Sequence, residues 1–327
     1  MIEHPSEEAL AALRRWIERE TRGRPWGCVV LTGGRTAAAW YGAGFSAESL
    51  FEIGSIRKSF NSALLGRGVQ DGRIDLQVKA HEVWPELLRI SGNPKDRQIT
   101  LHHLASGTSG WLTGDPPGRR FQYNNAAFTA AEQVTARLYG FPNGEIAPEA
   151  ERLFRDALGA RSWRMYHFPN RFDAKDIDNP GPKLAVDSNL GDLASWGQLW
   201  LDEGRRDGRQ LIPAGWVKRA CSRVNPELAP CIYGYNWFLN LDRAVWPQAP
   251  ADSFGHVGWG TFRPSGEESR AFLWVCPSLA TVAAMVTDVS VGFANDFLQV
   301  PMGLTAEWVA RVAAAVGGQG GRRGGRQ

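Results

Sequence analysis

The order of the expected elements is the feature that most limits how this chain can fold. Strand-like segments lie at both ends, at residues 26–31 and 36–41 and again within residues 233–287, while residues 76–200 between them are mainly helical. Short aromatic or β-branched runs bounded by glycine, proline and aspartate are typical of strands. We therefore expect one antiparallel sheet built from both ends of the chain and flanked by helices, with the helical stretch inserted as a lobe. The predicted fold class is α+β.

The spacing of apolar residues predicts the individual elements. We expect helices at residues 7–20, 55–69, 101–105, 126–138, 148–158, 190–201 and 301–316. In the carboxyl third we expect strands at residues 233–241, 253–262, 271–276 and 281–287. Asp187 and Ser188 are expected to cap the helix that begins at residue 190.

These elements predict a domain organisation. Residues 1–75 and 190–316 form a discontinuous α/β sheet domain, and residues 76–189 form the mainly helical lobe. Residues 317–327 are nearly all glycine, arginine and glutamine, a composition that cannot bury a core, so we expect a disordered tail. A cleft is expected where the sheet and the lobe meet.

Composition and charge exclude several classes of function. A net charge of +3 over 327 residues is too small to suggest nucleic-acid binding. No apolar run reaches the roughly 20 residues of a membrane helix, and the amino terminus lacks the basic and apolar segments of an export signal. We therefore expect a cytoplasmic protein that binds neither nucleic acid nor membrane.

The cysteines and histidines do not have the spacing of a metal site. The four cysteines form no CxxC pair, and the adjacent His102 and His103 lack ligand spacing to any other histidine or cysteine. We expect no metal and no cofactor. Four reduced thiols are expected, and a disulfide between Cys221 and Cys231 stays open as an alternative.

Ser55 and Lys58 are the strongest candidates for chemistry. They lie three residues apart at the start of a predicted helix, so the lysine amine can reach the serine hydroxyl on one helix face. A serine hydroxyl is a poor nucleophile at neutral pH, and it needs a neighbouring base and a site for the developing oxyanion. The helix start favours negative charge, and the N–H of Ser55 is a natural oxyanion donor. If the Ser-x-x-Lys pattern stood alone, the alternative would be that Ser55 is an ordinary helix cap and Lys58 a solvated lysine of the first turn.

Two more short motifs accompany this pair. The triplet Tyr-Asn-Asn at residues 123–125 comes just before a predicted helix, and His-Val-Gly at residues 256–258 lies in a predicted strand. Chance gives all three motifs in this order in roughly one such sequence in a hundred or fewer. Tyr123, if it lies alongside the pair, can pass a proton between the serine, the lysine and the leaving group. A half-buried structural aromatic is its alternative role.

Together the motifs resemble the serine β-lactamase and penicillin-binding-protein superfamily, specifically its branch of class C β-lactamases, esterases and D-amino-acid peptidases. Residues 51–58 are similar to the family's nucleophile segment, residues 70–76 to the segment after that helix, residues 99–110 to its Thr-Ser-Gly turn region and residues 191–197 to a later helix. The resemblance covers about residues 28–287. It implies the β-lactamase/transpeptidase-like fold.

The resemblance also implies roles for single residues. Asn125 matches the asparagine that binds a substrate amide carbonyl and orients the lysine, and the N–H of Trp259 matches the second oxyanion donor. His256 and Gly258 match the opposite, substrate-binding wall, where β-lactamases usually carry lysine in place of His256. A neutral imidazole binds a carboxylate less firmly than an ammonium does, so we expect weak or absent β-lactamase activity. A helix cap for Asn125 and a satisfied strand histidine for His256 are the structural alternatives.

The predicted function is a serine hydrolase that cleaves an ester or amide of a small molecule through an acyl-enzyme on Ser55, with Lys58 and Tyr123 as general base and acid. Trp111 and Trp237 are predicted to line the cleft and favour an apolar or aromatic acyl group, and core packing is the equal alternative. An acyltransferase that uses an amine or alcohol acceptor is a close alternative function. The other alternative function is a non-catalytic binding protein of the same fold.

Overall fold

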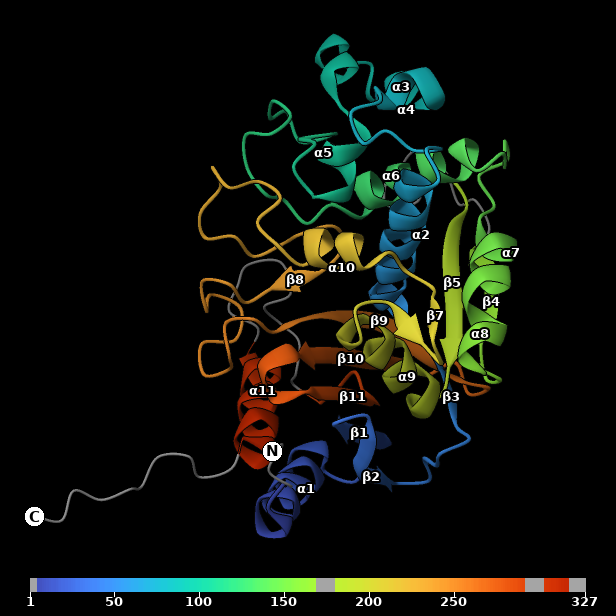
Figure 1. Cartoon of the computed structure of the whole chain (residues 1–327). Coiled ribbons are helices and arrows are strands. Elements are labelled where there is room, and N and C mark those ends of the chain that lie inside the picture. Colours follow the sequence, from blue (N-terminus) through green and yellow to red (C-terminus); the bar gives the residue numbers. More distant parts are fainter. Residues whose placement is uncertain (1–4, 169–179, 292–302, 318–327) are drawn as a thin grey trace, which may run out of the picture.

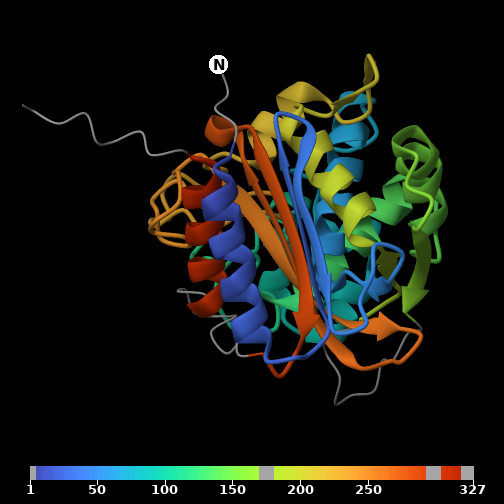
Figure 2. The same ribbon diagram turned by 90° about the horizontal axis from the view of Figure 1, so that it is seen from below.

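One large sheet with helices on both faces dominates the structure (Figures 1 and 2). The computed structural model describes residues 5–168, 180–291 and 303–317. Within these residues, nine antiparallel strands form a sheet in the order β2-β1-β11-β10-β9-β3-β5-β4, with β8 paired to β9. The predicted α+β class, an antiparallel sheet flanked by helices, is confirmed.

The described elements have the following bounds. The sheet strands are β1 (Trp26–Thr32), β2 (Arg35–Gly42), β3 (Leu50–Glu52), β4 (Arg164–Phe168), β5 (Lys183–Ser188), β8 (Phe238–Leu239), β9 (Phe254–Arg263), β10 (Glu268–Cys276) and β11 (Thr281–Asp288), while β6 (Arg205–Arg206) and β7 (Arg209–Gln210) form a separate ribbon. The longer helices are α1 (Glu7–Thr21), α2 (Lys58–Gln70), α6 (Asn125–Leu138), α9 (Leu190–Leu201) and α11 (Gly303–Val316). The short ones are η1 (Gly54–Arg57), α3 (Ala80–Val83), α4 (Glu86–Ser91), η2 (Pro94–Gln98), α5 (Leu101–Ala105), α7 (Ala147–Ala150), η3 (Glu151–Arg155), α8 (Asp156–Leu158), α10 (Ala214–Ala220) and η4 (Pro277–Leu279).

The two ends of the chain meet inside the sheet. β1 pairs with β11 in a continuous register that runs from Trp26 opposite Thr287 to Thr32 opposite Thr281. β10 lies on the other side of β11, and β9 follows β10. The expected sheet built from both ends of the chain is therefore confirmed.

Helices bury both faces of this sheet. α1 and α11 lie side by side on one face (Figure 2), where they bury Trp16 and Trp308. α2 and α9 lie on the other face, and Phe60 of α2 stacks on Trp196 of α9 with 4.0 Å between ring centroids. Residues Lys58 to Leu65 of α2 are all buried. The helix that follows Ser55 is therefore held in the core, and this limits how far the candidate nucleophile can move.

The segment predicted to be the helical lobe also contains two strands. β5 pairs with β3 and with β4, so residues 164–168 and 183–188 extend the sheet at this edge. Leu184 to Val186 are fully buried, and so short an apolar run cannot be told from a helix by periodicity. These two strands were not predicted within the segment expected to be mainly helical. The boundaries of the two domains stay a prediction.

Two smaller expectations are also wrong. Asn189 is the N-cap of α9, because its side chain accepts a backbone N–H of the first turn at 2.8 Å, whereas Asp187 and Ser188 end β5. Of the strand predicted at residues 233–241, only β8 forms. The left-handed backbone of Asn236, with φ of 61°, interrupts the extended conformation there.

Two other expectations concern the cysteines and the chain end. All four cysteines are free thiols, so the open alternative of a disulfide between Cys221 and Cys231 is wrong in this structure. Burial raises the pKa of Cys28 to about 12, so its thiol stays protonated at neutral pH. Of the tail predicted at residues 317–327, residues 318–327 lie outside the described residues, and so does the start of the last predicted helix, residues 301–302.

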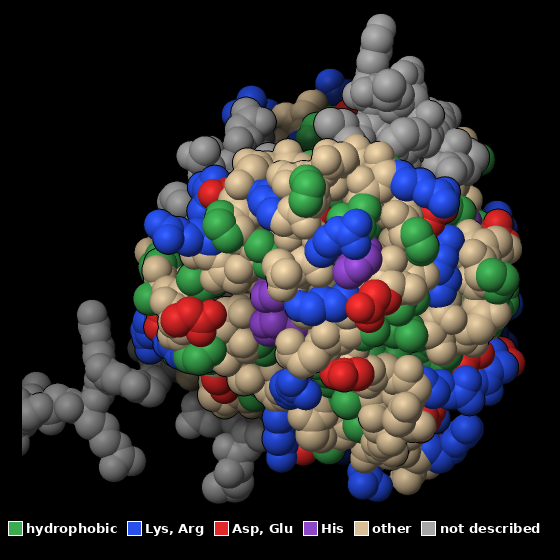
Figure 3. All heavy atoms as spheres, turned by 90° about the horizontal axis from the view of Figure 1, so that it is seen from above, with side chains coloured by type: hydrophobic (Ala, Val, Ile, Leu, Met, Phe, Trp, Pro, Cys, Tyr) green, Lys and Arg blue, Asp and Glu red, His purple; other side chains and the backbone are tan. Residues whose placement is uncertain are grey.

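The surface is mixed in charge. On the face seen from above, basic and acidic side chains are interspersed around a few histidines (Figure 3). Within the described ranges, no helix combines the length and the apolar character needed to span a bilayer.

A buried ion pair joins the lobe to the segment that carries the motif serine. Arg57 of η1 contacts the carboxylate of Glu132 on α6, and both side chains are at most 5% exposed. The second oxygen of Glu132 accepts the backbone N–H of Leu184 in β5 at 3.0 Å. One carboxylate therefore connects η1, α6 and β5.

We expect Glu132→Gln to lower the free energy of unfolding by about 3 kcal/mol, because it leaves the buried guanidinium of Arg57 without a counter-ion. Urea denaturation measures this loss. The control is Glu307→Gln, which breaks the exposed pair with Arg311 and should cost at most about 1 kcal/mol. Equal losses in the two variants would contradict the role given to the buried pair.

Candidate active site

Ser55 lies at a tight turn between β3 and α2. Gly54 has a φ of 55°, a left-handed conformation that favours glycine, and a Cβ there would lie 2.4 Å from the backbone nitrogen of Trp259. The turn therefore needs a glycine both for its backbone angle and for the close approach of β9. Ser55 is partly exposed, whereas its neighbours Gly54 and Ile56 are buried.

Lys58 is the centre of the site. Its side chain is buried, with 1% of the residue exposed. Its Nζ atom lies 2.8 Å from Ser55 Oγ, 2.8 Å from the hydroxyl of Tyr123 and 3.0 Å from Asn125 Oδ1. The structure therefore brings together all four of these predicted residues around one amine.

Asn124 explains how Asn125 reaches the lysine. The side chain of Asn124 caps α6, because its Oδ1 accepts the N–H of Ala127 at 3.1 Å, and its Nδ2 donates to the carbonyl of Trp111 at 2.8 Å. Asn125 is the first residue of the helix and its side chain turns to Lys58 instead. The helix-cap alternative for Asn125 is therefore wrong, since its neighbour fills that role.

Tyr123 is held by aromatic packing. Its ring stacks on Phe238 at 5.7 Å with 10° between the ring planes, and it contacts Phe128 and Tyr233 at 5.1 Å and 6.1 Å. Burial raises the pKa of the Tyr123 phenol well above its ordinary value. A phenol held in this way keeps its proton at neutral pH and can donate it in a hydrogen bond.

The middle of β9 has an open edge that faces Ser55. β9 pairs with β8 at its start and with β3 at its end, and the described residues offer no strand partner between these points. Phe262 directs its N–H to the β10 side, where it donates to Glu267 at 2.8 Å. Because N–H groups alternate along a strand, Trp259 directs its own N–H to the open edge. The backbone nitrogens of Ser55 and Trp259 thus face the same space.

Gly258 brings β9 this close. A Cβ at this position would lie 1.9 Å from the carbonyl oxygen of Ile53 and 3.1 Å from the nitrogen of Ser55. The structure therefore gives Gly258 a packing role against the turn that carries Ser55, and its predicted substrate contact stays a prediction.

His256 lies behind this wall. It is 1% exposed; its Nδ1 donates to the carbonyl of Val257 at 2.7 Å, which leaves Nε2 to accept the hydroxyl of Tyr233 at 3.3 Å. Burial, and next the charge of Lys58, lower the pKa of His256 to about 3. The structure therefore favours the alternative of a satisfied strand histidine, and the predicted substrate contact is corrected.

Two predicted cleft residues belong to the core. Trp111 and Trp237 are both 0% exposed. Trp111 donates its Nε1–H to the carbonyl of Leu87 at 3.2 Å, and Trp237 packs edge to face on Trp200 and Phe254. Side chains without exposed surface cannot contact a substrate, so the core-packing alternative is correct for both.

Two contributors to this site were not predicted from the sequence: Tyr233, which orients His256, and Arg270, whose guanidinium lies 3.6 Å from the centroid of the Trp259 ring. Neither lies in a recognisable motif. Arg270 could be found only through the register that pairs it with Trp259. Trp259 itself is 52% exposed.

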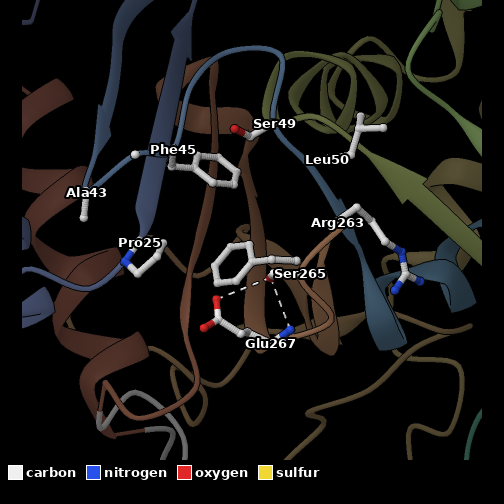
Figure 4. Close-up of a pocket in the computed structure, with 10 residues that line it drawn as sticks. Pro25, Ala43, Phe45, Ser49, Leu50, Arg263, Ser265 and Glu267 are labelled. Atoms are coloured by element: carbon white, nitrogen blue, oxygen red, sulfur yellow. Dashed lines mark hydrogen bonds between the residues drawn. The ribbon is translucent and has the colours of Figure 1, made fainter.

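A separate pocket of about 140 Å³ lies at the far end of β9 (Figure 4). Phe45, Leu50, Phe262 and Arg263 line it, together with residues near the β9–β10 turn. None of the residues around Lys58 contributes to it. The pocket is therefore distinct from the candidate active site.

Comparison with known proteins agrees with this geometry. A sequence model of the Beta-lactamase family matches residues 19–297, which is most of the chain. The chain belongs to the Beta-lactamase family. The expected superfamily and the β-lactamase/transpeptidase-like fold are therefore confirmed.

Solved structures share the fold at low sequence identity. A putative β-lactamase from Bacteroides dorei superposes with a TM-score of 0.68 and 16% identity, covering 94% of this chain and 98% of the other. The octameric penicillin-binding protein homologue from Pyrococcus abyssi superposes with a TM-score of 0.65 and 15% identity, covering 86% of this chain and 74% of the other. At these identities the likeness establishes the fold alone.

Curated relatives are also distant. The 6-aminohexanoate-dimer hydrolase of Paenarthrobacter ureafaciens is 24% identical over 228 residues, which are 58% of this chain and 55% of that protein. A β-lactamase of Escherichia coli K12 is 40% identical over 65 residues, 20% of this chain and 16% of the relative. The match thus spans about half of the length of the first relative and less of the second.

The burial of His256 predicts a pH-dependent stability. Its folded pKa of about 3 lies below the ordinary 6.5, so as the pH falls below about 6.5 the unfolded chain binds a proton that the folded chain does not. The free energy of unfolding of the wild type therefore falls by about 1.4 kcal/mol per pH unit as the pH is lowered to about 3.

We expect His256→Gln to remove this pH-dependent part of the free energy of unfolding. The difference in unfolding free energy between wild type and variant should then be constant above about pH 7 and change with that slope below about pH 6. Urea denaturation at a series of pH values measures it. A constant difference over the whole range would contradict the neutral, buried state of His256.

Proposed function

We propose that this protein is a serine hydrolase that cleaves an ester or amide of a small molecule through an acyl-enzyme on Ser55. The observation that carries the proposal is the amine of Lys58, within 2.8 to 3.0 Å of Ser55 Oγ, the hydroxyl of Tyr123 and Asn125 Oδ1. A nucleophile, a base and a second proton carrier in contact are what acyl transfer requires.

In the first step, Ser55 Oγ attacks the substrate carbonyl carbon and its proton moves to the amine of Lys58, which can act as the base only in its neutral form. The carbonyl oxygen becomes an oxyanion and accepts hydrogen bonds from the N–H groups of Ser55 and Trp259. Gly54 and Gly258 support this assignment, since they let β9 approach the turn at Ser55 closely. The orientation of both donors is fixed before the substrate binds.

In the second step, the oxyanion collapses and the bond to the leaving group breaks. The leaving oxygen or nitrogen takes the phenolic proton of Tyr123, and Lys58 returns its extra proton to the phenolate. The acyl group is then bonded to Ser55 Oγ. A water molecule attacks the acyl carbon with the same groups acting in reverse, which releases a carboxylic acid and restores the Ser55 hydroxyl.

The substrate class follows from the relatives and from His256. The name of the 6-aminohexanoate-dimer hydrolase supports hydrolysis of a small amide. His256 is buried and its pKa is lowered to about 3, so it does not supply the positive charge that a β-lactam carboxylate would meet from a lysine. We therefore propose esterase or amidase activity, with weak or absent β-lactamase activity.

Transfer of the acyl group to an amine or alcohol is the alternative outcome of the second half-reaction. It uses the same acyl-enzyme, so the two outcomes differ only in the acceptor. Product partitioning with added nucleophile distinguishes them.

A fluorophosphonate should add one phosphonyl group to the wild-type protein and none to Ser55→Ala, because only an activated serine reacts. Intact mass spectrometry measures the adduct, and peptide mapping locates it. Ser46→Ala, which removes an exposed hydroxyl, is the control and should label as the wild type does. If the wild type stays unlabelled, or Ser55→Ala labels equally, the protein is not a Ser55 hydrolase and the non-catalytic alternative gains support.

Lys58→Ala and Tyr123→Phe should each lower kcat/KM for an aryl ester by about 10²- to 10⁴-fold, because each removes a proton carrier. Circular dichroism checks that the variants are folded. Matched controls are Lys218→Ala and Tyr41→Phe, whose side chains make no contact with the site, and these should keep wild-type rates. Wild-type rates in Tyr123→Phe would remove Tyr123 from the proposed proton path.

A further inference from the structure

The pocket at the far end of β9 is a concave site of its own, apart from Lys58 (Figure 4). Its volume is about 140 Å³, and a cavity of this size holds roughly one benzene ring. Its apolar walls are Phe45 and Phe262, whose rings meet edge to face with 5.6 Å between centroids, and Pro25 and Leu50 beside them. Such a hollow favours a ligand with a compact apolar body.

Two turns hold these walls in place. In the loop between β2 and β3, the N–H of Ser46 donates to Ser49 Oγ at 2.9 Å. Between β9 and β10, the N–H of Phe262 donates to the carbonyl of Glu267 at 2.8 Å, and the N–H of Gly266 donates back to the carbonyl of Phe262 at 2.9 Å. Because the walls are already formed, a ligand would bind without the entropic cost of ordering them.

Arg263 lines the pocket, but its charge is compensated outside it. The guanidinium pairs with Asp187 at 3.1 Å and with Glu52 at 3.6 Å, and its Nη2 donates to the hydroxyl of Tyr166 at 2.7 Å. None of these three partners lines the pocket. Figure 4 likewise shows the guanidinium directed away from Glu267. Arg263 is therefore not expected to draw an anion into the pocket.

Glu267 supplies the uncompensated charge of the pocket. Its carboxylate accepts the hydroxyl of Ser265 at 3.3 Å (Figure 4). Within the described part of the chain, no arginine, lysine or histidine forms an ion pair with it. A carboxylate beside two aromatic rings suits an ammonium group, because both the negative charge and the ring faces attract a cation.

We propose that this pocket binds small organic ammonium ions that carry one aromatic ring or an apolar body of similar size. The ammonium group meets the carboxylate of Glu267, and the apolar body packs on Phe45 and Phe262. Since a strand rises about 3.3 Å per residue, Phe262 lies about 10 Å along β9 from Trp259. The ligand is therefore bound apart from the acyl-enzyme, and the inference does not depend on the proposed function.

Three small probes separate the contribution of the charge from that of the ring. 2-Phenylethylammonium carries both, 2-phenylethanol carries the ring alone, and propylammonium carries the charge alone. Ligand-observed NMR titrations to about 20 mM measure each dissociation constant, since molecules of this size gain only a weak affinity. We expect a millimolar Kd for 2-phenylethylammonium and at least roughly 3-fold weaker binding of each of the other two probes.

Glu267→Gln should weaken the binding of 2-phenylethylammonium by roughly 3- to 10-fold, between the effects of an exposed ion pair and a charge-assisted hydrogen bond. It should leave the binding of 2-phenylethanol unchanged. The matched control is Glu268→Gln, which removes the same charge from an exposed neighbour that does not line the pocket and should keep the wild-type affinity. Phe45→Leu removes one aromatic wall and should weaken both ring-bearing probes.

Three results would overturn the proposal. The first is no saturable binding of 2-phenylethylammonium to the wild type. The second is an equal affinity in Glu267→Gln and the wild type, or an equal loss in Glu267→Gln and Glu268→Gln, which would reduce the effect to the overall charge. The third is loss of binding in Ser55→Ala, which would place the probe at the candidate active site. None of these results decides whether the protein is a Ser55 hydrolase, which the fluorophosphonate label tests.

Discussion

The three hydrogen bonds of the Lys58 amine are the interaction on which the rest of the site depends. They join the nucleophile turn that carries Ser55, the segment that ends at Tyr123 and the first residue of α6, Asn125. These segments are far apart in the sequence and belong to the predicted sheet domain and the predicted lobe. A buried amine between them can keep its partners only while the packing of α2 and α6 holds, and the pair of Arg57 with Glu132 connects η1, which directly precedes α2, to α6. The chemistry of the site and the association of the two parts are therefore coupled.

The close approach of β9 to the turn that carries Ser55 is the second constraint on the site. Gly54 and Gly258 each lie where a Cβ would collide with the backbone of the facing segment. Because these two residues have no side chains, β9 can approach the turn at Ser55 closely, as the proposed pair of backbone donors for the oxyanion requires. The indole of Trp259 on β9 stacks on the guanidinium of Arg270 on the neighbouring strand β10.

The short motifs whose spacing has a physical reason were predictable from the sequence. The spacing of Ser55 and Lys58 follows from helix geometry, and the central strands and long helices follow from apolar patterning. What failed depends on tertiary contacts. Trp111 and Trp237 are indistinguishable from cleft aromatics in the sequence because burial is set by the packing of distant elements, and the partnership of His256 with Tyr233 requires a loop whose path has no local signature. Arg270 is visible only once the register of β9 and β10 is known.

A crystal structure of the protein after reaction with a fluorophosphonate tests the account most directly. We predict a phosphorus atom bonded to Ser55 Oγ, with the phosphonyl oxygen within about 3 Å of the nitrogens of both Ser55 and Trp259 and the Lys58 amine still in contact with Ser55 Oγ. An adduct on another residue, or a phosphonyl oxygen that points to solvent while Lys58 has left the serine, would contradict the account.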